Sequence, residues 1–402
     1  MSRPAALSPP ARPCHSRGMN DRIAAWLARC PDPATDPLPG MREAGLLEPV
    51  DDYAAIARGK AALVEATRLL GIAGVWGGRH LVYRHFLGFG PPAQREAWRG
   101  RALAVAISEP NVGAHPKLLT TRAERVDGGF RLAGQKAWVT NGPSADAIIV
   151  FAITAEEAGR KRYGAFIVPR DTPGLAMADM PGFHALRPSR HCLLTLDACF
   201  VPDAALLGEP GSAYDRMALP FRDIEDAVGS FATLGALRHA IGLCAGGPAE
   251  QAEALGAVVA LTAVFAAGAQ AVVAALDAGS FRTGDATLVG LRLLATDIVA
   301  RLRAMFAGMT PPPVVMAATR NKSPGTGSGP PSTPGDAGSD PVADSRLPIP
   351  GQGHVSPGAR QDDPLAAILS DLDATLGIAR GPRLARQVQL GAAALRGGGG
   401  AP

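Results

Sequence analysis

The chain has few cysteines and few aromatic residues. Of its 402 residues, five are cysteine and 5% are aromatic. An odd number of cysteines without a Cys-x-x-Cys pair argues against both a disulfide framework and a structural zinc site, so we predict no metal ligands. A reducing, cytoplasmic compartment is the expected location. The cysteines are Cys14, Cys30, Cys192, Cys199 and Cys244.

The chain also has no concentration of charge of one sign. Its formal net charge is +4, and charged residues make up only 19%. The longest basic cluster is Arg160-Lys161-Arg162, which lies between two apolar runs and is typical of a solvated hairpin tip. A nucleic-acid interface would need a broader basic face, so no nucleic-acid partner is expected.

Targeting and membrane segments are not evident either. Residues 1–18 contain arginines and prolines but no apolar stretch of the secretory kind, and Met19 is an alternative start. Residues 257–276 carry no charge and are long enough to cross a membrane. Nine of these twenty residues are alanine, and no aromatic or basic residues flank them. We therefore predict an Ala-rich helix buried in a bundle and no membrane span.

Hydrophobic residues make up 47% of the chain, which is enough for a sizeable core. The spacing of the hydrophobic residues along the chain changes twice. Asp127-Gly128 between apolar runs predicts a β-hairpin within a series of short strands. The order of helices, strands and helices predicts an α+β protein with a helical N-terminal domain, a central antiparallel β-domain and a C-terminal helical bundle. Pro, Gly and Ser dominate one insert, which we predict to be disordered. The segments are a disordered arm (1–18), an N-terminal α-helical domain (19–100), a middle β-domain (101–206), a first C-terminal helical part (207–308), the disordered insert (309–363) and further C-terminal helices (364–396).

Nucleotide-binding, metalloprotease and serine-hydrolase motifs are absent, and the strongest signal lies in the predicted β-domain. Two runs stand out, followed by Phe166-Ile167-Val168 and Phe200-Val201-Pro202 at matching spacing. This series resembles the acyl-CoA dehydrogenase family, and Met41-Arg42-Glu43-Ala44-Gly45-Leu46-Leu47 resembles its N-terminal helical domain. The two runs are Ala106-Ile107-Ser108-Glu109-Pro110-Asn111-Val112-Gly113 and Gly134-Gln135-Lys136-Ala137-Trp138-Val139-Thr140-Asn141-Gly142.

The resemblance implies bound FAD. A flavin needs an apolar wall, hydrogen bonds to its polar edge and little water. The positions matching Ser108 and Thr140 bond the ring edge in the family, and the tryptophan matching Trp138 packs against the ring. We expect these residues on one β-surface. The implied cofactor-binding residues are Ile107, Ser108, Trp138, Val139 and Thr140, and the implied substrate-binding residue is Ala114.

The family's reaction needs a carboxylate base that removes the α-proton of an acyl thioester. In many members the base precedes the last helix, but Arg380 occupies that position here and cannot act as a base. Isovaleryl-CoA and long-chain enzymes carry the glutamate on the first helix of the C-terminal domain, and Glu225 in Asp223-Ile224-Glu225-Asp226 matches it. Glu225 is therefore the expected catalytic base. The alternative is that these acids only complement the helix dipole.

The resemblance implies FAD-dependent α,β-dehydrogenation of an acyl-CoA in fatty acid metabolism, an electron-transferring flavoprotein as acceptor, and a homo-oligomer. Three departures keep alternatives open. Ala114-His115 replaces the usual Ser-Asp, Asp226 replaces an arginine, and the Arg-Phe-Gly and Gly-Gly-x-Gly segments that contact the dinucleotide are missing. A flavin-poor relative acting as a partner subunit, or a flavin-dependent oxidase or hydroxylase of the same fold, is the alternative.

Overall fold

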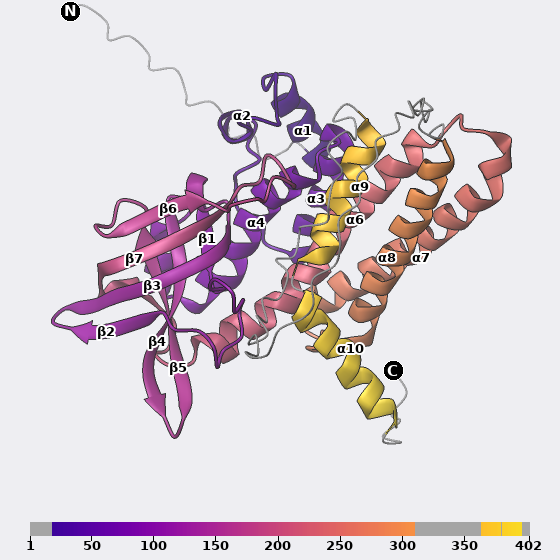
Figure 1. Ribbon diagram of the computed structural model, residues 1–402. Coiled ribbons are helices and arrows are strands. Elements are labelled where there is room, and N and C mark those ends of the chain that lie inside the picture. Colours follow the sequence, from indigo (N-terminus) through magenta and orange to yellow (C-terminus); the bar gives the residue numbers. More distant parts are fainter. Residues whose placement is uncertain (1–17, 310–362, 379, 396–402) are drawn as a thin grey trace, which may run out of the picture.

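The computed structural model describes residues 18–309, 363–378 and 380–395. In this part of the chain, helices from both ends pack beside an eight-stranded sheet (Figure 1). This confirms the α+β class and the order of helices, strands and helices. Nearly all of the predicted arm and insert lie outside the described residues.

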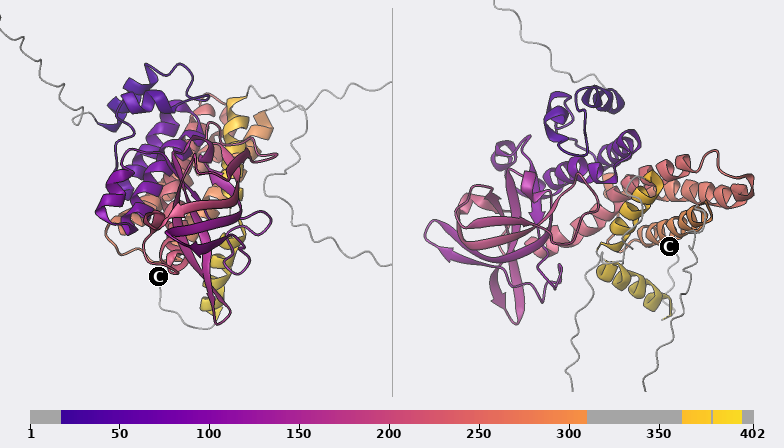
Figure 2. Two further views of the ribbon diagram at one scale, coloured as in Figure 1. Left: turned by 90° about the vertical axis from the view of Figure 1, so that its left-hand side faces the viewer. Right: turned by 45° about the horizontal axis from the view of Figure 1, so that its top comes forward.

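The N-terminal helices form one block above and beside the sheet (Figure 2). The pattern predicts one helical run over 54–70 and a second through 76–87, and the structure has two helices that divide earlier, near Arg68. Arg68 has a left-handed φ of 63° and Leu69 is extended, so the chain turns there before the second helix begins. The elements are α1 (Met19–Leu27), α2 (Leu38–Glu43), α3 (Tyr53–Thr67), α4 (Leu70–Phe86), the short 3-10 turn η1 (Leu87–Phe89) and α5 (Pro92–Ala97).

The sheet is mostly antiparallel, with the path β6-β7-β3-β2-β4-β5-β8. The predicted hairpin at Asp127-Gly128 is confirmed, because β2 and β3 flank it. The predicted antiparallel β-domain is confirmed, and the exceptions are at β4, whose pairings with β1 and β2 are parallel. The strands are β1 (Leu103–Ala106), β2 (Arg122–Val126), β3 (Gly129–Thr140), β4 (Ala147–Glu157), β5 (Arg160–Pro169), β6 (Leu175–Asp179), β7 (His191–Pro202) and β8 (Leu206–Leu207).

Alternation along β4 separates two hydrophobic cores. Successive side chains of a strand point to opposite faces. Ile149 and Phe151 join the core shared with the helices, and Ile148 and Val150 join a second core on the other side of the sheet. A side chain of the sheet is therefore placed by its register either toward the helices or away from them.

Most of the C-terminal helices lie on the side of the molecule away from the sheet, but the turn and the helix that open this part approach the sheet (Figure 1). Their order agrees with the predicted helical segments. They are the π-helical turn η4 (Tyr214–Ala218), α6 (Leu219–Leu243), the short turn η5 (Ala249–Gln251), α7 (Ala252–Asp277), α8 (Ala286–Met309), α9 (Pro364–Gly377) and α10 (Arg380–Leu395).

The Ala-rich helix is less enclosed than predicted. Residues Ala249–Asp277 are long and apolar enough to cross a membrane, and 33% of their most apolar window is buried. One face, with Val258, Phe265 and Val272, packs into the helical core, while Val264 is 62% exposed. The helix packs in the bundle, but the described chain covers only one of its faces, so it is less buried than predicted.

Candidate active site

The predicted cofactor residues meet where the end of β3 faces the helices. Val139 and its cross-strand partner Cys192 point into the core on the other side of the sheet, so Thr140 and its partner His191 face the helical side. The register shifts between Lys136 and Val139, and Trp138 has a left-handed φ of 59° at this bulge. Bulges redirect side chains, and this one sets the direction of the indole.

Backbone hydrogen bonding brings Ser108 to the same place. The Ala137 amide donates to the Ser108 carbonyl oxygen at 2.9 Å, which ties the segment after β1 to β3 next to Trp138. Ser108 and Thr140 are half-buried, and neither hydroxyl has a hydrogen-bond partner among the described residues. Two hydroxyls beside one indole are thus available to a ligand.

Aromatic rings form the rest of this surface. The rings of Trp138 and His191 have centroids 6.2 Å apart, and Phe183 lies 5.3 Å from Trp138 and 4.9 Å from His191. His191 is 9% exposed and its Nδ1 has no partner within the described chain. Burial lowers the pKa of His191 to about 4, so its ring is neutral at physiological pH. An unpaired buried nitrogen is costly.

This surface therefore suits an isoalloxazine ring. It offers apolar ring faces and two free hydroxyls that are only partly exposed to water, which is what a flavin requires. Val139 can contribute only through its backbone, because its side chain is fully buried in the other core. Ile107 is partly buried against the helical core.

A buried ion pair supports this surface. Lys136 Nζ lies 3.0 Å from Glu109 Oε1 and donates to the Ile107 carbonyl oxygen at 3.1 Å. The Thr120 and Thr121 amides also donate to Glu109, at 2.7 and 2.9 Å. Burial alone would raise the pKa of Glu109, but Lys136 and these hydrogen bonds outweigh it and bring the pKa to about 2. Burial lowers the pKa of Lys136 to about 8, against the opposing effect of Glu109.

Asn141 fixes the end of β3 against α4. Its side-chain amide donates to the Gly74 carbonyl oxygen at 2.8 Å, and its Oδ1 accepts from the Ser189 hydroxyl at 3.1 Å. Its own φ is 59°, a conformation that asparagine tolerates better than most residues. These two hydrogen bonds hold α4 at a fixed distance from the aromatic surface of Trp138, Phe183 and His191.

The expected base, Glu225, lies in the second turn of α6. The side chain is exposed in this single chain, yet desolvation by the surrounding protein raises its pKa. The Asp226 carboxylate adds to this rise, while Lys60, Arg383 and Arg222 oppose it. One turn further, a Cβ built on Gly229 would meet no atom within 4 Å. The small residue leaves open space one turn from Glu225.

Asp226 has a structural explanation. Arg383 of α10 lies 2.5 Å from its carboxylate, and Arg386 is paired with both Asp226 and Asp223. The acid that replaces the family's usual arginine thus holds α10 across the start of α6. Glu225 takes no part in this network of described ion pairs. The side chain of Arg380 lies outside the described structure.

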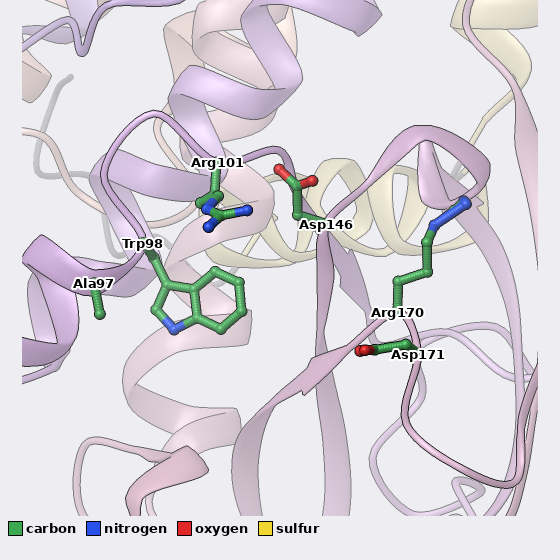
Figure 3. A pocket seen from close by; sticks show the side chains of 6 residues that line it. All are labelled: Ala97, Trp98, Arg101, Asp146, Arg170 and Asp171. Carbon is green, nitrogen blue, oxygen red and sulfur yellow. The ribbon is translucent and has the colours of Figure 1, made fainter.

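A basic cavity of about 540 Å³ lies beside the expected substrate residue Ala114. The Tyr214 hydroxyl donates to the Ala114 carbonyl oxygen at 2.5 Å, and Tyr214 lines this cavity. A second cavity of about 340 Å³ opens where β1 begins and β5 ends (Figure 3). It is lined by Ala97, Trp98, Arg101, Asp146, Arg170 and Asp171, none of which was predicted as a site residue. The first cavity is lined by Pro116, Lys117, Gly159, Arg160, Lys161, Tyr163, Gly211, Tyr214 and Asp215.

Sequence reasoning did not single out Lys60, Glu109, Lys136 or His191. Glu109 and Lys136 lie inside the two recognised runs, and charged residues within apolar strands were the available signal. Nothing in the sequence distinguishes His191, because its role depends on pairing between distant strands. Lys60 looks like an ordinary helix residue until the helices are packed.

Comparison with known proteins identifies the middle of the chain. Residues 104–199 match the family described as acyl-CoA dehydrogenase, middle domain. The mitochondrial isovaleryl-CoA dehydrogenase of Oryza sativa subsp. japonica is 37% identical over 158 residues, which cover 37% of this chain and 39% of the relative. The human mitochondrial short-chain specific acyl-CoA dehydrogenase is 32% identical over 177 residues, 42% of each chain. The matches thus span about two fifths of the length of these curated relatives.

Solved structures share the whole architecture. The butyryl-CoA dehydrogenase of Megasphaera elsdenii superposes with a TM-score of 0.70 at 18% identity, covering 94% of this chain and 96% of that one. A glutaryl-CoA dehydrogenase of Mycobacterium smegmatis in complex with FADH2 gives a TM-score of 0.54 at 22% identity and covers 64% and 70%. At these identities the likeness establishes the fold.

Proposed function

We propose that the chain, whose middle part matches the acyl-CoA dehydrogenase family, is an FAD-dependent dehydrogenase that introduces an α,β double bond into an acyl-CoA thioester. One observation carries this proposal. The matched middle domain presents Ser108, Trp138 and Thr140 together, with both hydroxyls unpaired among the described residues. The domain bounds predicted from the sequence are retained as part of this proposal.

Each group has a task that its surroundings support. Bound FAD supplies the hydride acceptor. Ser108 and Thr140 would donate hydrogen bonds to the ring edge, and Trp138 would cover the ring. Glu225 would accept the α-proton, and its raised pKa suits a carboxylate base that works near neutral pH.

The basic cavity beside Ala114 suits the coenzyme A end of the substrate. Lys117, Arg160 and Lys161 line it, and CoA carries anionic phosphates. Lys161 already donates to the Lys117 and Leu119 carbonyl oxygens, which fixes its ammonium at the wall. The thioester would then extend from this cavity towards Trp138 and Glu225.

The exposed apolar face of α7 supports a homo-oligomer. Val259 and Val264 on α7 and Leu293 on α8 are 48%, 62% and 50% exposed. A second copy packed on these helices would remove that surface from water. An electron-transferring flavoprotein as acceptor and a cytoplasmic location remain part of the proposal, and several curated relatives are mitochondrial.

An anaerobic titration of the purified, FAD-loaded protein with a panel of acyl-CoA thioesters tests the proposal. Flavin absorbance near 450 nm should fall with at least one thioester in the wild type. Glu225→Gln should bind FAD unchanged and abolish the bleaching. A protein that takes up no FAD would favour the partner-subunit alternative, and oxygen consumption without any thioester would favour the oxidase or hydroxylase.

A further inference from the structure

Lys60 is a buried cation without a hydrogen-bond partner in the described chain. It comes from α3 and is 7% exposed. Its aliphatic stem lies on Gly77 of α4, where an added Cβ would come within 2.1 Å of Cε. A buried ammonium normally pairs with an anion, because burying an unpaired charge is strongly unfavourable. The fold accommodates Lys60 through a glycine on the neighbouring helix, yet gives it no acceptor.

The ammonium of Lys60 remains open to water. Fully enclosed polar atoms without partners occur at Gln94, His191 and Asp223 in the described chain, and Lys60 is not among them. Its stem is covered while its charged end reaches accessible space. Burial lowers the pKa of Lys60, and the one charge that acts on it in return is Glu225.

Lys60 and Glu225 are neighbours that do not touch. The charge of each residue affects the pKa of the other, but their side chains form no ion pair within 4.0 Å. The helices that carry them are held together independently, since Arg238 of α6 pairs with Glu65 of α3 at 2.9 Å. Because the two charges are separated, a ligand group can contact both.

The charged side chains around Glu225 favour the binding of an anion beside Lys60. Lys60, Arg222 and Arg383 are the cations that act on Glu225, and Asp226 is the nearby anion. Asp226 is already neutralised by Arg383 and Arg386. Arg383 is paired with Asp226, whereas neither Lys60 nor Arg222 forms an ion pair among the described residues, and Lys60 is the buried one of these two.

We propose that Lys60 is the recognition group for a carboxylate at the far end of the acyl chain, so that the substrates are CoA monothioesters of dicarboxylic acids. This rests on the proposed function, because the α-carbon must approach Glu225 for proton transfer. The chain beyond that carbon then extends towards Lys60, where a carboxylate accepts a charge-assisted hydrogen bond.

The test compares matched thioesters on the FAD-loaded full-length protein. Glutaryl-CoA and adipyl-CoA carry the terminal carboxylate, and valeryl-CoA and hexanoyl-CoA are their uncharged counterparts. Calorimetric affinity is measured beside anaerobic flavin bleaching, so that selectivity is read even without turnover. Wild type should favour the carboxylate of each pair by about tenfold or more, as one charged hydrogen bond gives.

Two variants make the result specific. Lys60→Met should abolish or reverse the preference, because the methylene stem stays and the charge is lost. Arg58→Met removes an exposed cation from the same helix and should leave the preference unchanged. Equal affinity of wild type for both members of each pair, or a preference that survives Lys60→Met, overturns the inference. Bleaching by valeryl-CoA with no carboxylate preference would leave the proposed function intact, whereas carboxylate-selective binding without bleaching by any thioester would contradict only the proposed function.

Discussion

Two buried lysines in different parts of the molecule differ in whether the fold provides an acceptor for their charge. Lys136 in the sheet is 0% exposed and pairs with Glu109, whose remaining acceptor positions are filled by backbone amides. Lys60 between the helices is 7% exposed and has no acceptor within the described chain. A satisfied buried pair holds a structure in place, while an unsatisfied buried charge at the edge of accessible space is suited to binding.

The strongest test of this difference is Lys136→Met. It leaves Glu109 as a buried carboxylate without its cation and should lower the free energy of unfolding by about 3–5 kcal/mol. Urea denaturation at pH 7 measures the loss. The double variant Glu109→Gln with Lys136→Met should recover much of it, and additive losses would show that the two residues act independently.

The pH dependence of stability sharpens the same comparison. The pKa of Glu109 is about 2 in the folded chain and 4.5 without the fold. Its stabilising contribution is therefore complete above about pH 4.5 and is lost as the pH falls towards 2. Wild type should lose stability over this window more steeply than Glu109→Gln, as thermal melts in matched buffers will show. Parallel curves would mean that the Glu109 pKa is not lowered.

Asp226→Asn should have a smaller effect. It removes the anion that holds Arg383 and Arg386 against α6, and these groups are 13–16% exposed. We expect a loss of about 1–2 kcal/mol, between the values for buried and exposed pairs. Arg383→Gln is the matched variant, and the double variant should lose less than the sum. Full additivity in this cycle would argue against the pairing.

Lys60→Met should change stability least and in the opposite direction to Lys136→Met. Removing a buried charge that lacks an acceptor should raise the free energy of unfolding by up to about 1 kcal/mol. The same urea titration measures both methionine variants. If Lys60→Met destabilises the chain as much as Lys136→Met does, Lys60 has a structural partner and the contrast between the two lysines is wrong.

More of the sheet than of the packing between the helices could be predicted from the sequence. Asp127-Gly128 and the alternating apolar runs specify hairpins locally, so most strands were predictable. The approach of Ser108 to Trp138 could be expected because both lie in recognised runs. His191 and Lys60 could not be placed, because one depends on the pairing of β3 with β7 and the other on a glycine of a different helix. The exposed face of α7 was also missed, since composition does not reveal how much of a helix its own chain covers.

The most direct measurement is the affinity of the purified apoprotein for FAD, compared between wild type and Ser108→Ala/Thr140→Val. The two hydroxyls have no partners in the described chain, so the double variant should fold normally and melt at the wild-type temperature. Fluorescence titration should give wild type a dissociation constant lower by about tenfold or more, as two lost hydrogen bonds predict. Equal dissociation constants, or no binding by either protein, would contradict a flavin site at the end of β3.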